Sequence, residues 1–267
     1  PRLSACVPGP ATAGPGTHAL SLGYHYDEYA LVSDGYGVAT WKHGEPDTPL
    51  SRYGGRTRTQ AVYAQDAWQW SERWQLTYGL RYERWRAFDG GIGNAASYLR
   101  YPERSEAHAS PKLSLAYQVS DDWRLRLALA RAYRFPTVAE LFQGSIAGVA
   151  IINNNPNLKP ENDLSRELSA EWYRGNQQAR FSLYWSDTRN TLFSQTDVTV
   201  VPSITNVQNV GRVRTRGAEA DYQGQGVIWP WLDLAANAAY TQATVLEDRQ
   251  FPAAVGKQFY RVPRWRA

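Results

Sequence analysis

The chain has 267 residues, with 29 Lys and Arg against 25 Asp and Glu, which gives a formal net charge of +4 at pH 7. Its mean hydropathy is -0.54, and no apolar run approaches the roughly 20 residues that a membrane-spanning helix requires, so a helical membrane protein is excluded. The positive charge is almost wholly arginine and is spread along the chain. A nucleic-acid-binding module would instead cluster its basic residues on one face.

Segments in which apolar and polar residues alternate recur along the chain. In residues 74–86, apolar side chains from Trp74 to Tyr82 occupy every second position. Because successive side chains of a strand point to opposite faces, this alternation predicts a β-strand with one apolar face. Residues 123–133 repeat the pattern, although Arg131 interrupts their apolar face. About eleven strands and no convincing helix are predicted after a Pro/Gly-rich N-terminal loop. In chain order the strands lie at residues 18–30, 36–43, 56–70, 74–86, 109–119, 123–133, 163–174, 178–189, 206–223 and 231–241, with an incomplete one near 259–266.

The connections between the predicted strands alternate between short and long. The short ones are rich in residues that tolerate turn geometry and cover residues 71–73, 120–122, 174–177 and 224–230. The long ones, at 88–108, 135–162, 190–205 and 245–258, exceed ordinary hairpin loops. This alternation is typical of bacterial outer-membrane barrels, which have short periplasmic turns and long extracellular loops.

At least one tryptophan lies beside each of the short connections. These residues are Trp70, Trp74, Trp123, Trp172, Trp229 and Trp231. Such clustering is expected if all four turns lie in one aromatic belt at a membrane interface. From Trp123 to Tyr133 the strand would project to about 25 Å at a tilt of about 40°, the height of a barrel's lipid-facing band. The sequence therefore predicts an all-β, antiparallel, transmembrane barrel; a soluble sandwich with Trp at its rim is the alternative.

Candidate catalytic and metal-binding residues form no recognisable motif. Cys6 is the only cysteine and has no partner for a disulfide within the chain. Asp121 and Asp122 fall in a predicted tight turn, where solvated turn chemistry explains them. No zinc motif, phosphate loop or nucleophile elbow is found, and no carboxylate or cysteine stands at ligand spacing from His18, His25, His43 or His108. We expect no enzyme activity, no metal site and no cofactor.

Four groups of residues form motifs in chain order. The first motif is Tyr63, Gln65, Asp66 and Trp68, followed by the Gly79–Tyr82 strand. The second motif begins with Arg134, Phe135, Pro136 and Glu140 and continues with Asn155, Pro156, Asn157, Leu158, Lys159, Pro160, Glu161 and Glu167. The third motif is Asn209–Gly211 with Gly217 and Glu219, and the fourth is Gly256 and Lys257 with Val262–Arg264. Together they resemble the barrel signature of TonB-dependent outer-membrane receptors.

The resemblance implies an architecture larger than this chain. Receptors of this family combine a 22-stranded barrel with an N-terminal plug that contacts the TonB complex. Residues 1–267 would form one partial barrel domain of about 10–11 strands, and we expect the plug domain and the remaining strands to lie outside this sequence. The implied location is the bacterial outer membrane, crossed many times, with membrane lipid and the TonB complex as partners and no nucleic acid.

The resemblance also implies a function, which is active uptake of a scarce nutrient, most often a ferric siderophore. Tyr98, Arg100, Tyr101 and Arg104 in the 88–108 connection, with Arg134 at a strand end, combine aromatic and cationic groups suited to an anionic aromatic chelate. Cobalamin, haem or a glycan would also fit the family. A passive porin, a structural barrel and a soluble β-protein that binds an acidic partner remain open.

The motif residues are expected to maintain the barrel and not to touch ligand. Pro136 lacks a backbone donor and would end a ladder, and Pro156 and Pro160 would give the 135–162 connection a defined shape. Gly217, inside a predicted strand, indicates a close backbone approach or a bend in the wall.

Overall fold

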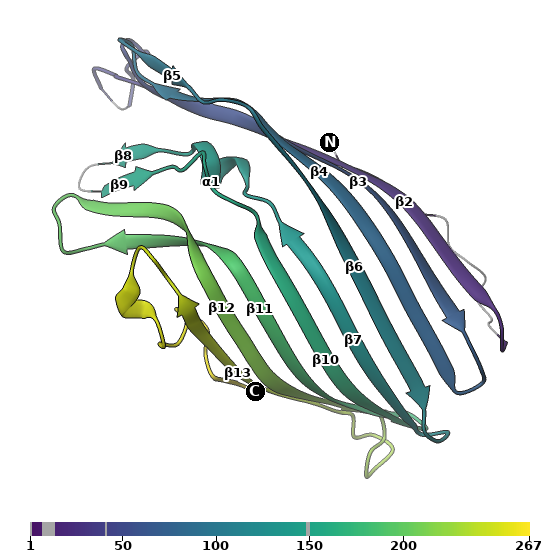
Figure 1. Cartoon of the computed structure of the whole chain (residues 1–267). Helices are drawn as coiled ribbons and strands as arrows, with labels where there is room; N and C mark the ends of the chain where they lie inside the picture. Colours follow the sequence, from purple (N-terminus) through teal and green to yellow (C-terminus); the bar gives the residue numbers. More distant parts are fainter. Residues whose placement is uncertain (1, 7–13, 41, 148–149) are drawn as a thin grey trace.

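The chain forms one curved antiparallel β-sheet (Figure 1). A computed structural model describes residues 2–6, 14–40, 42–147 and 150–267. The main path of the sheet consists of β1 (Arg2–Cys6), β2 (His18–Tyr36), β3 (Pro49–Gln69), β4 (Trp74–Gly93), β6 (Arg104–Gln118), β7 (Trp123–Arg134), β10 (Glu161–Arg174), β11 (Gln177–Asp197), β12 (Ser203–Gly224), β13 (Leu234–Glu247) and β14 (Trp265–Arg266), each hydrogen-bonded to the next. The predicted all-β antiparallel architecture is confirmed.

Short elements at one end of the wall complete the fold. β5 (Tyr98–Arg100) pairs with β4, and β8 (Ser145–Ala147) pairs with β9 (Ala150–Asn153), which in turn pairs in parallel with β12. α1 (Val138–Phe142) and the 3₁₀ turn η1 (Pro252–Ala254) are the helical segments of the described residues. None of the described helices is long and apolar enough to cross a membrane.

Several boundaries differ from the sequence prediction. β4 continues to Gly93 and β11 to Asp197, so most of the predicted loops 88–108 and 190–205 is strand. These hairpins carry polar residues on both faces, so they lack the one-sided apolar pattern on which the prediction rested. Of the predicted strand at 36–43, Tyr36 is the last residue of β2, and residues 37–40 and 42–43 form no strand, so the prediction was wrong for these residues. The predicted N-terminal loop was wrong at residues 2–6, which form β1. The described residues contain almost no helix, and α1 is a five-residue helix within the predicted 135–162 loop.

Strand registers assign every residue of the wall to one of two faces. Tyr82 of β4, for example, lies opposite Val62 of β3 and Ala109 of β6, whereas Trp85 belongs to the other face. The first face carries large exposed apolar side chains, among them Leu80, Leu127 and Leu168, which are 52%, 45% and 46% exposed. The second face carries mostly polar residues. Because the described residues form one sheet with no second layer, these apolar side chains do not converge into a packed interior.

The second face is the concave one. α1, β8 and β9 lie within the curve of the sheet (Figure 1), and Phe142 of α1 contacts that face at Gly55 and Gly90. A Cβ atom on either glycine would lie 2.3 or 2.2 Å from the Phe142 ring. Glycine at both positions therefore lets the helix dock against the wall from inside. The apolar face is accordingly outward, and the polar face lines the lumen.

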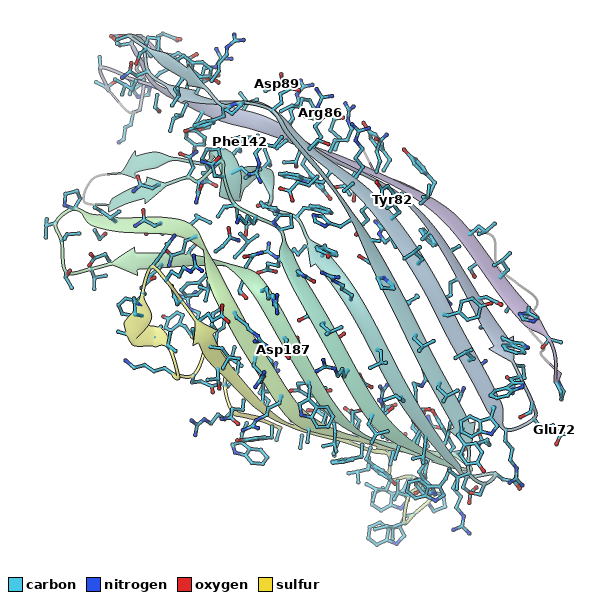
Figure 2. The ribbon with its side chains drawn as sticks, in the orientation of Figure 1. Glu72, Tyr82, Arg86, Asp89, Phe142 and Asp187 are labelled. Atoms are coloured by element: carbon cyan, nitrogen blue, oxygen red, sulfur yellow. The ribbon has the colours of Figure 1, made fainter. Side chains whose placement is uncertain are left out.

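Glu72 lies in the turn between β3 and β4, and Tyr82, Arg86 and Asp89 follow along β4 towards the opposite end of the wall (Figure 2). The four predicted tight connections lie at the Glu72 end, which we call the turn end. The long hairpins and the inward helix lie at the Asp89 end, which we call the loop end.

Candidate ligand site at the loop end

The segment between β7 and β10, of which the structure describes residues 135–147 and 150–160, is fixed by hydrogen bonds and by a small core. We call it the inward segment. Thr137 caps α1 and shares a capping box with Glu140. Leu141 and Leu158 are 0% exposed and pack with Phe142, Trp85, Ala87 and Leu192 in one cluster. Asn209 of β12 accepts from the backbone N–H of Lys159 at 2.8 Å and donates to the carbonyl of Lys159 at 2.9 Å. The segment is therefore held in one shape across three strands.

Arg134 holds the two ends of this segment together. Its Nε donates to Glu161 at 2.7 Å, and its Nη1 donates to Glu140 at 3.1 Å. Burial opposes its positive charge, but the hydrogen bond to Glu161 and the charges of both carboxylates outweigh that cost and raise the pKa of Arg134 above its usual value. The carboxylates of Glu140 and Glu161 and the guanidinium of Arg134 are therefore already hydrogen-bonded to one another.

A cationic pocket of about 530 Å³ opens where β6 and β7 cease to pair. Three cations contribute to its lining, Arg104, Arg131 and Lys159, and among the described residues that line it Glu106 is the one carboxylate. Arg104 donates to Glu106 at 2.8 Å and lies 5.8 Å from the centre of the Trp85 ring. The remaining lining residues are His108, Tyr133, Asn157, Pro160, Asn162 and Asn190.

Aromatic surface lines the same pocket. The rings of His108 and Tyr133 stack with centroids 4.1 Å apart, and Arg131 lies over the Tyr133 ring at 5.2 Å. Flat aromatic rings beside guanidinium groups can hold an anionic, partly aromatic ligand by stacking and by charge-assisted hydrogen bonds.

A second pocket of about 440 Å³ lies nearer the tip of the β4–β6 hairpin. Its charges balance, with Arg52 and Arg100 against Asp89 and Glu103. Tyr98 lies against Gly91 and Gly93, where a Cβ would meet its atoms within 3 Å. Tyr101 also contributes to the lining. Its ring stacks on Phe142 at 6.0 Å and its hydroxyl accepts from Asn154 at 3.2 Å, so it supports the inward segment as well.

The five residues predicted to bind ligand are thus divided among three places. Tyr98, Arg100 and Tyr101 line the second pocket, Arg104 lines the cationic pocket, and Arg134 lines neither of the two. Sequence reasoning missed Lys159, which it had assigned to a structural motif, and Arg131, which it had noted only as an interruption of an apolar face. Arg131 carried a usable signal, because a cation at an apolar strand position near a strand end indicates the membrane boundary.

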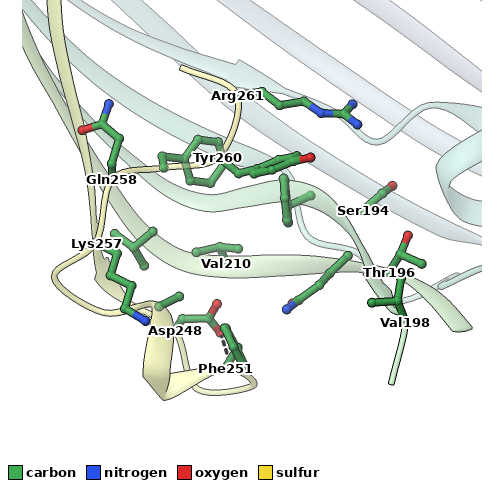
Figure 3. Close-up of a pocket in the computed structure, with 15 residues that line it drawn as sticks. Ser194, Thr196, Val198, Val210, Asp248, Phe251, Lys257, Gln258, Tyr260 and Arg261 are labelled. Carbon is green, nitrogen blue, oxygen red and sulfur yellow. Dashed lines mark hydrogen bonds between the residues drawn. The ribbon is translucent and has the colours of Figure 1, made fainter. Parts of the chain in front are cut away.

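A third pocket, also missed, has a volume of about 650 Å³ and lies between the loop ends of β11 and β12 and residues 248–261 (Figure 3). Phe193, Val210 and Phe259 give it an apolar lining. Lys257 and Arg261 add positive charge, and the Asp248 carboxylate accepts from the backbone N–H of Phe251 at 2.9 Å.

The other motif residues lie away from these pockets. Asp66 and Trp68 are outward and near the turn end, where Asp66 accepts from the Tyr78 hydroxyl at 2.9 Å and lies 2.6 Å from the His18 ring. Gly217 faces the lumen under the Tyr184 ring. The remaining motif residues of the wall, Tyr63, Gln65, Glu167 and Glu219, are assigned to the lumen face by register, and Glu167 pairs with Arg180 there. Within the described residues no group of three or more His, Cys, Asp or Glu is arranged to hold a metal ion.

An outward apolar face, a polar concave face and tight turns at one end define the wall of a transmembrane β-barrel. The chain belongs to the TonB dependent receptor-like β-barrel family, whose family model matches residues 4–267. Barrels of this family lie in the bacterial outer membrane, so the turn end is periplasmic and the loop end extracellular. The family is one of transport receptors.

The chain is also similar to individual proteins. It is 29% identical over 217 residues to a protein of Haemophilus influenzae described as an uncharacterized TonB-dependent receptor, and the match covers 79% of this chain and 56% of that protein. It is 25% identical over 117 residues to the iron-regulated outer membrane virulence protein of Vibrio cholerae, covering 43% of this chain and 15% of that protein.

Among solved structures, the ferric citrate transporter FecA matches with a TM-score of 0.66 and 20% identity, covering 99% of this chain and 37% of FecA. The chain thus spans about half the length, or less, of these proteins.

Proposed function

We propose that the receptor to which this wall belongs captures an anionic ferric chelate at the extracellular end of its barrel, where β6 and β7 separate, and takes it up with the help of the TonB complex. By register Arg104 and His108 belong to the lumen face of the wall, and Arg131 and Tyr133 belong to its outward face. The observation that carries the proposal is the cationic pocket, in which Arg104, Arg131 and Lys159 surround a space of about 530 Å³ beside the stacked His108 and Tyr133 rings. The similarity to an iron-regulated outer membrane protein supports iron as the cargo.

The charge balance separates the cationic pocket from the pocket around Tyr98 and Arg100. The cationic pocket holds three cations against Glu106, whereas the pocket around Tyr98 and Arg100 holds two cations against two carboxylates. A ligand with several negative charges is favoured at the first by its field, which also speeds encounter. We assign Tyr98 and Arg100 to first contact at the rim and Arg104 and Lys159 to the bound state. Arg134 positions the inward segment through Glu140 and Glu161.

The test uses the full-length receptor in an iron-starved strain that lacks other chelate receptors. Uptake of ⁵⁵Fe bound to a panel of anionic catecholate and citrate chelates is compared with uptake of haem, cobalamin and an oligosaccharide. The double variant Arg104→Gln/Lys159→Gln should lose at least about tenfold in affinity for the chelate, since each charge-assisted hydrogen bond contributes about 1.5–3 kcal/mol. Arg124→Gln, at the periplasmic end, is the matched control and should leave affinity unchanged.

Two results would refute the proposal. Uptake of a neutral glycan or of cobalamin with no uptake of any ferric chelate would assign the receptor another cargo. Uptake that persists after collapse of the proton-motive force would favour a passive porin, since diffusion through a channel needs no energy from the TonB complex.

A further inference from the structure

Five arginines gather on the outward face of three neighbouring strands. The strand registers place Arg166 of β10, Trp185 of β11 and Arg216 of β12 in one row. The next row holds Leu164, Asp187 and Arg214, and the one after it holds Asn162, Arg189 and Arg212. We call Arg166, Arg189, Arg212, Arg214 and Arg216 the arginine patch.

The arginine patch has far more positive than negative charge. Within β10, β11 and β12 Asp187 is the one carboxylate of these three rows, and it is shared by Arg212 at 2.9 Å, Arg214 at 3.2 Å and Arg166 at 3.9 Å. Glu247 of β13 lies opposite Arg212 in the register. Arg189 lies directly opposite Arg212, a like-charge arrangement that is unfavourable in a sheet unless an anion lies nearby. Within these three strands one carboxylate against five guanidinium groups leaves an excess of four positive charges, and an excess of three remains when Glu247 is counted.

Two arginines of the lumen face are arranged differently. Arg180 pairs with Glu167, and Arg126 lies 3.5 Å from Glu171. Each of these cations has a carboxylate of its own. The excess charge of the arginine patch is therefore a feature of the outward surface and does not follow from the general abundance of arginine in the chain.

The position of the patch relates it to the membrane. On the same three strands the outward residues nearer the turn end are apolar, from Trp172 to Leu168 on β10 and from Tyr222 to Ala218 on β12. Six residues separate Trp172 from Arg166 and ten separate Tyr222 from Arg212, so at about 3.3 Å per residue and about 40° of tilt the patch extends from about 15 to 25 Å above the periplasmic belt. That interval reaches the outer boundary of the hydrocarbon band.

Arginine at this depth is costly without a partner. An arginine on the lipid face of a barrel costs about 2–4 kcal/mol at the midplane and about 0–1 kcal/mol near the interface. Its long side chain can extend towards the head groups, and its planar fork binds phosphate oxygens in pairs. A membrane anion bound to the arginine patch would offset both the desolvation cost and the repulsion between Arg189 and Arg212.

We propose that the arginine patch is a binding site for an outer-leaflet lipid whose head group carries two or more phosphates. Arg212 and Arg214, 26% and 46% exposed at the side chain, bind the phosphates. Arg166 and Arg216 reach up from the row below, on either side of Trp185, whose ring lies against the lipid chains. Asp187 competes with the phosphates for Arg166, Arg212 and Arg214.

The test is performed on the full-length receptor in a neutral detergent, with native mass spectrometry to count bound lipid. Diphosphorylated lipid A is the probe, and phosphatidylcholine and inorganic pyrophosphate are the comparisons. Arg212→Gln/Arg214→Gln should weaken lipid A binding by about tenfold or more, because two charge-assisted contacts are lost. Arg84→Gln/Arg86→Gln is the matched control, since it removes two outward arginines from β4, and it should change binding less than about twofold.

A second variant protects the test from misfolding. Asp187→Asn removes the carboxylate that competes with lipid phosphate, so it should retain lipid A more tightly, whereas a purely structural cluster would predict no gain. The proposal is overturned if Arg212→Gln/Arg214→Gln binds lipid A as the unchanged receptor does, if Asp187→Asn binds it no better, or if pyrophosphate binds as tightly as lipid A. Association of receptor copies that is lost with the patch would also overturn it.

Discussion

The inward segment should depend on one aromatic side chain. Phe142 is 3% exposed and lies between Gly55 and Gly90, whose missing side chains make room for its ring. Replacing a buried Phe by Ala costs about 3–5 kcal/mol, from lost transfer energy and from the cavity left behind. The wall is held by its own strand ladders, so we expect this loss to fall on the docking of residues 135–160 and not on the barrel.

Hydrogen exchange with mass spectrometry measures this effect in the full-length receptor. A loss of 3 kcal/mol or more raises the population of the undocked segment by about a hundredfold or more, so peptides within residues 135–160 should lose protection while β10 and β11 keep theirs. Phe251→Ala is the control, because that side chain is 45% exposed and its loss should leave the segment protected. Unchanged protection in Phe142→Ala, or equal loss of protection in the strands, would show that the ring does not anchor the segment.

Three further predictions follow from single residues. Gly217→Ala should destabilise the wall by about 1–3 kcal/mol, because the new Cβ would lie 2.2 Å from the carbonyl oxygen of Tyr240. The thermal unfolding temperature should therefore fall, and an unaltered unfolding temperature would contradict the close contact. Arg134→Gln should also increase hydrogen exchange in residues 135–160, because it lowers the free energy of docking of this segment by about 1 kcal/mol, a small value since the Arg134 side chain is 45% exposed. Arg134→Lys should restore part of the protection. Equal protection in the unchanged receptor and in both variants would refute the positioning role of Arg134. Hydrogen bonds from Thr199 lower the pKa of Asp197, so the order they give the 197–203 hairpin is present at neutral pH and is lost as the pH falls through that lowered pKa. A spin label at position 200 should become more mobile in acid, and constant mobility would refute this.

The sequence predicted the wall well and its extracellular end poorly, for a physical reason. In the membrane one face of each strand meets hydrocarbon, so residues such as Leu125, Leu127 and Leu129 show a strict period of two. Above the membrane both faces meet water or protein, the period disappears, and the extensions of β4 and β11 read as loops. The helix α1 was missed because five residues are too few to show a helical period.

The candidate site was only partly predictable, because local composition identifies residue types but does not show which residues the fold brings together. Aromatic and cationic composition identified Tyr98, Arg100 and Arg104 as residues of the extracellular end. It could not show that Arg134 is tied to two carboxylates, because Glu140 and Glu161 reach it only through the fold. Lys159 joins Arg104 in the lining of the cationic pocket only because the inward segment folds back against the wall, and no local pattern in the sequence indicates that both residues line one pocket.

The central claim is that alternate side chains of each strand face lipid and lumen. Single cysteines introduced along β7 in the full-length receptor, with Cys6 replaced by Ser, can be spin-labelled in a lipid bilayer and tested for collisions with oxygen and with a water-soluble nickel chelate. Labels at positions 125, 127 and 129 should collide preferentially with oxygen, and labels at 126, 128 and 130 preferentially with the nickel chelate. Equal accessibility at both sets of positions, or labels at 125, 127 and 129 that neither reagent reaches, would contradict the barrel.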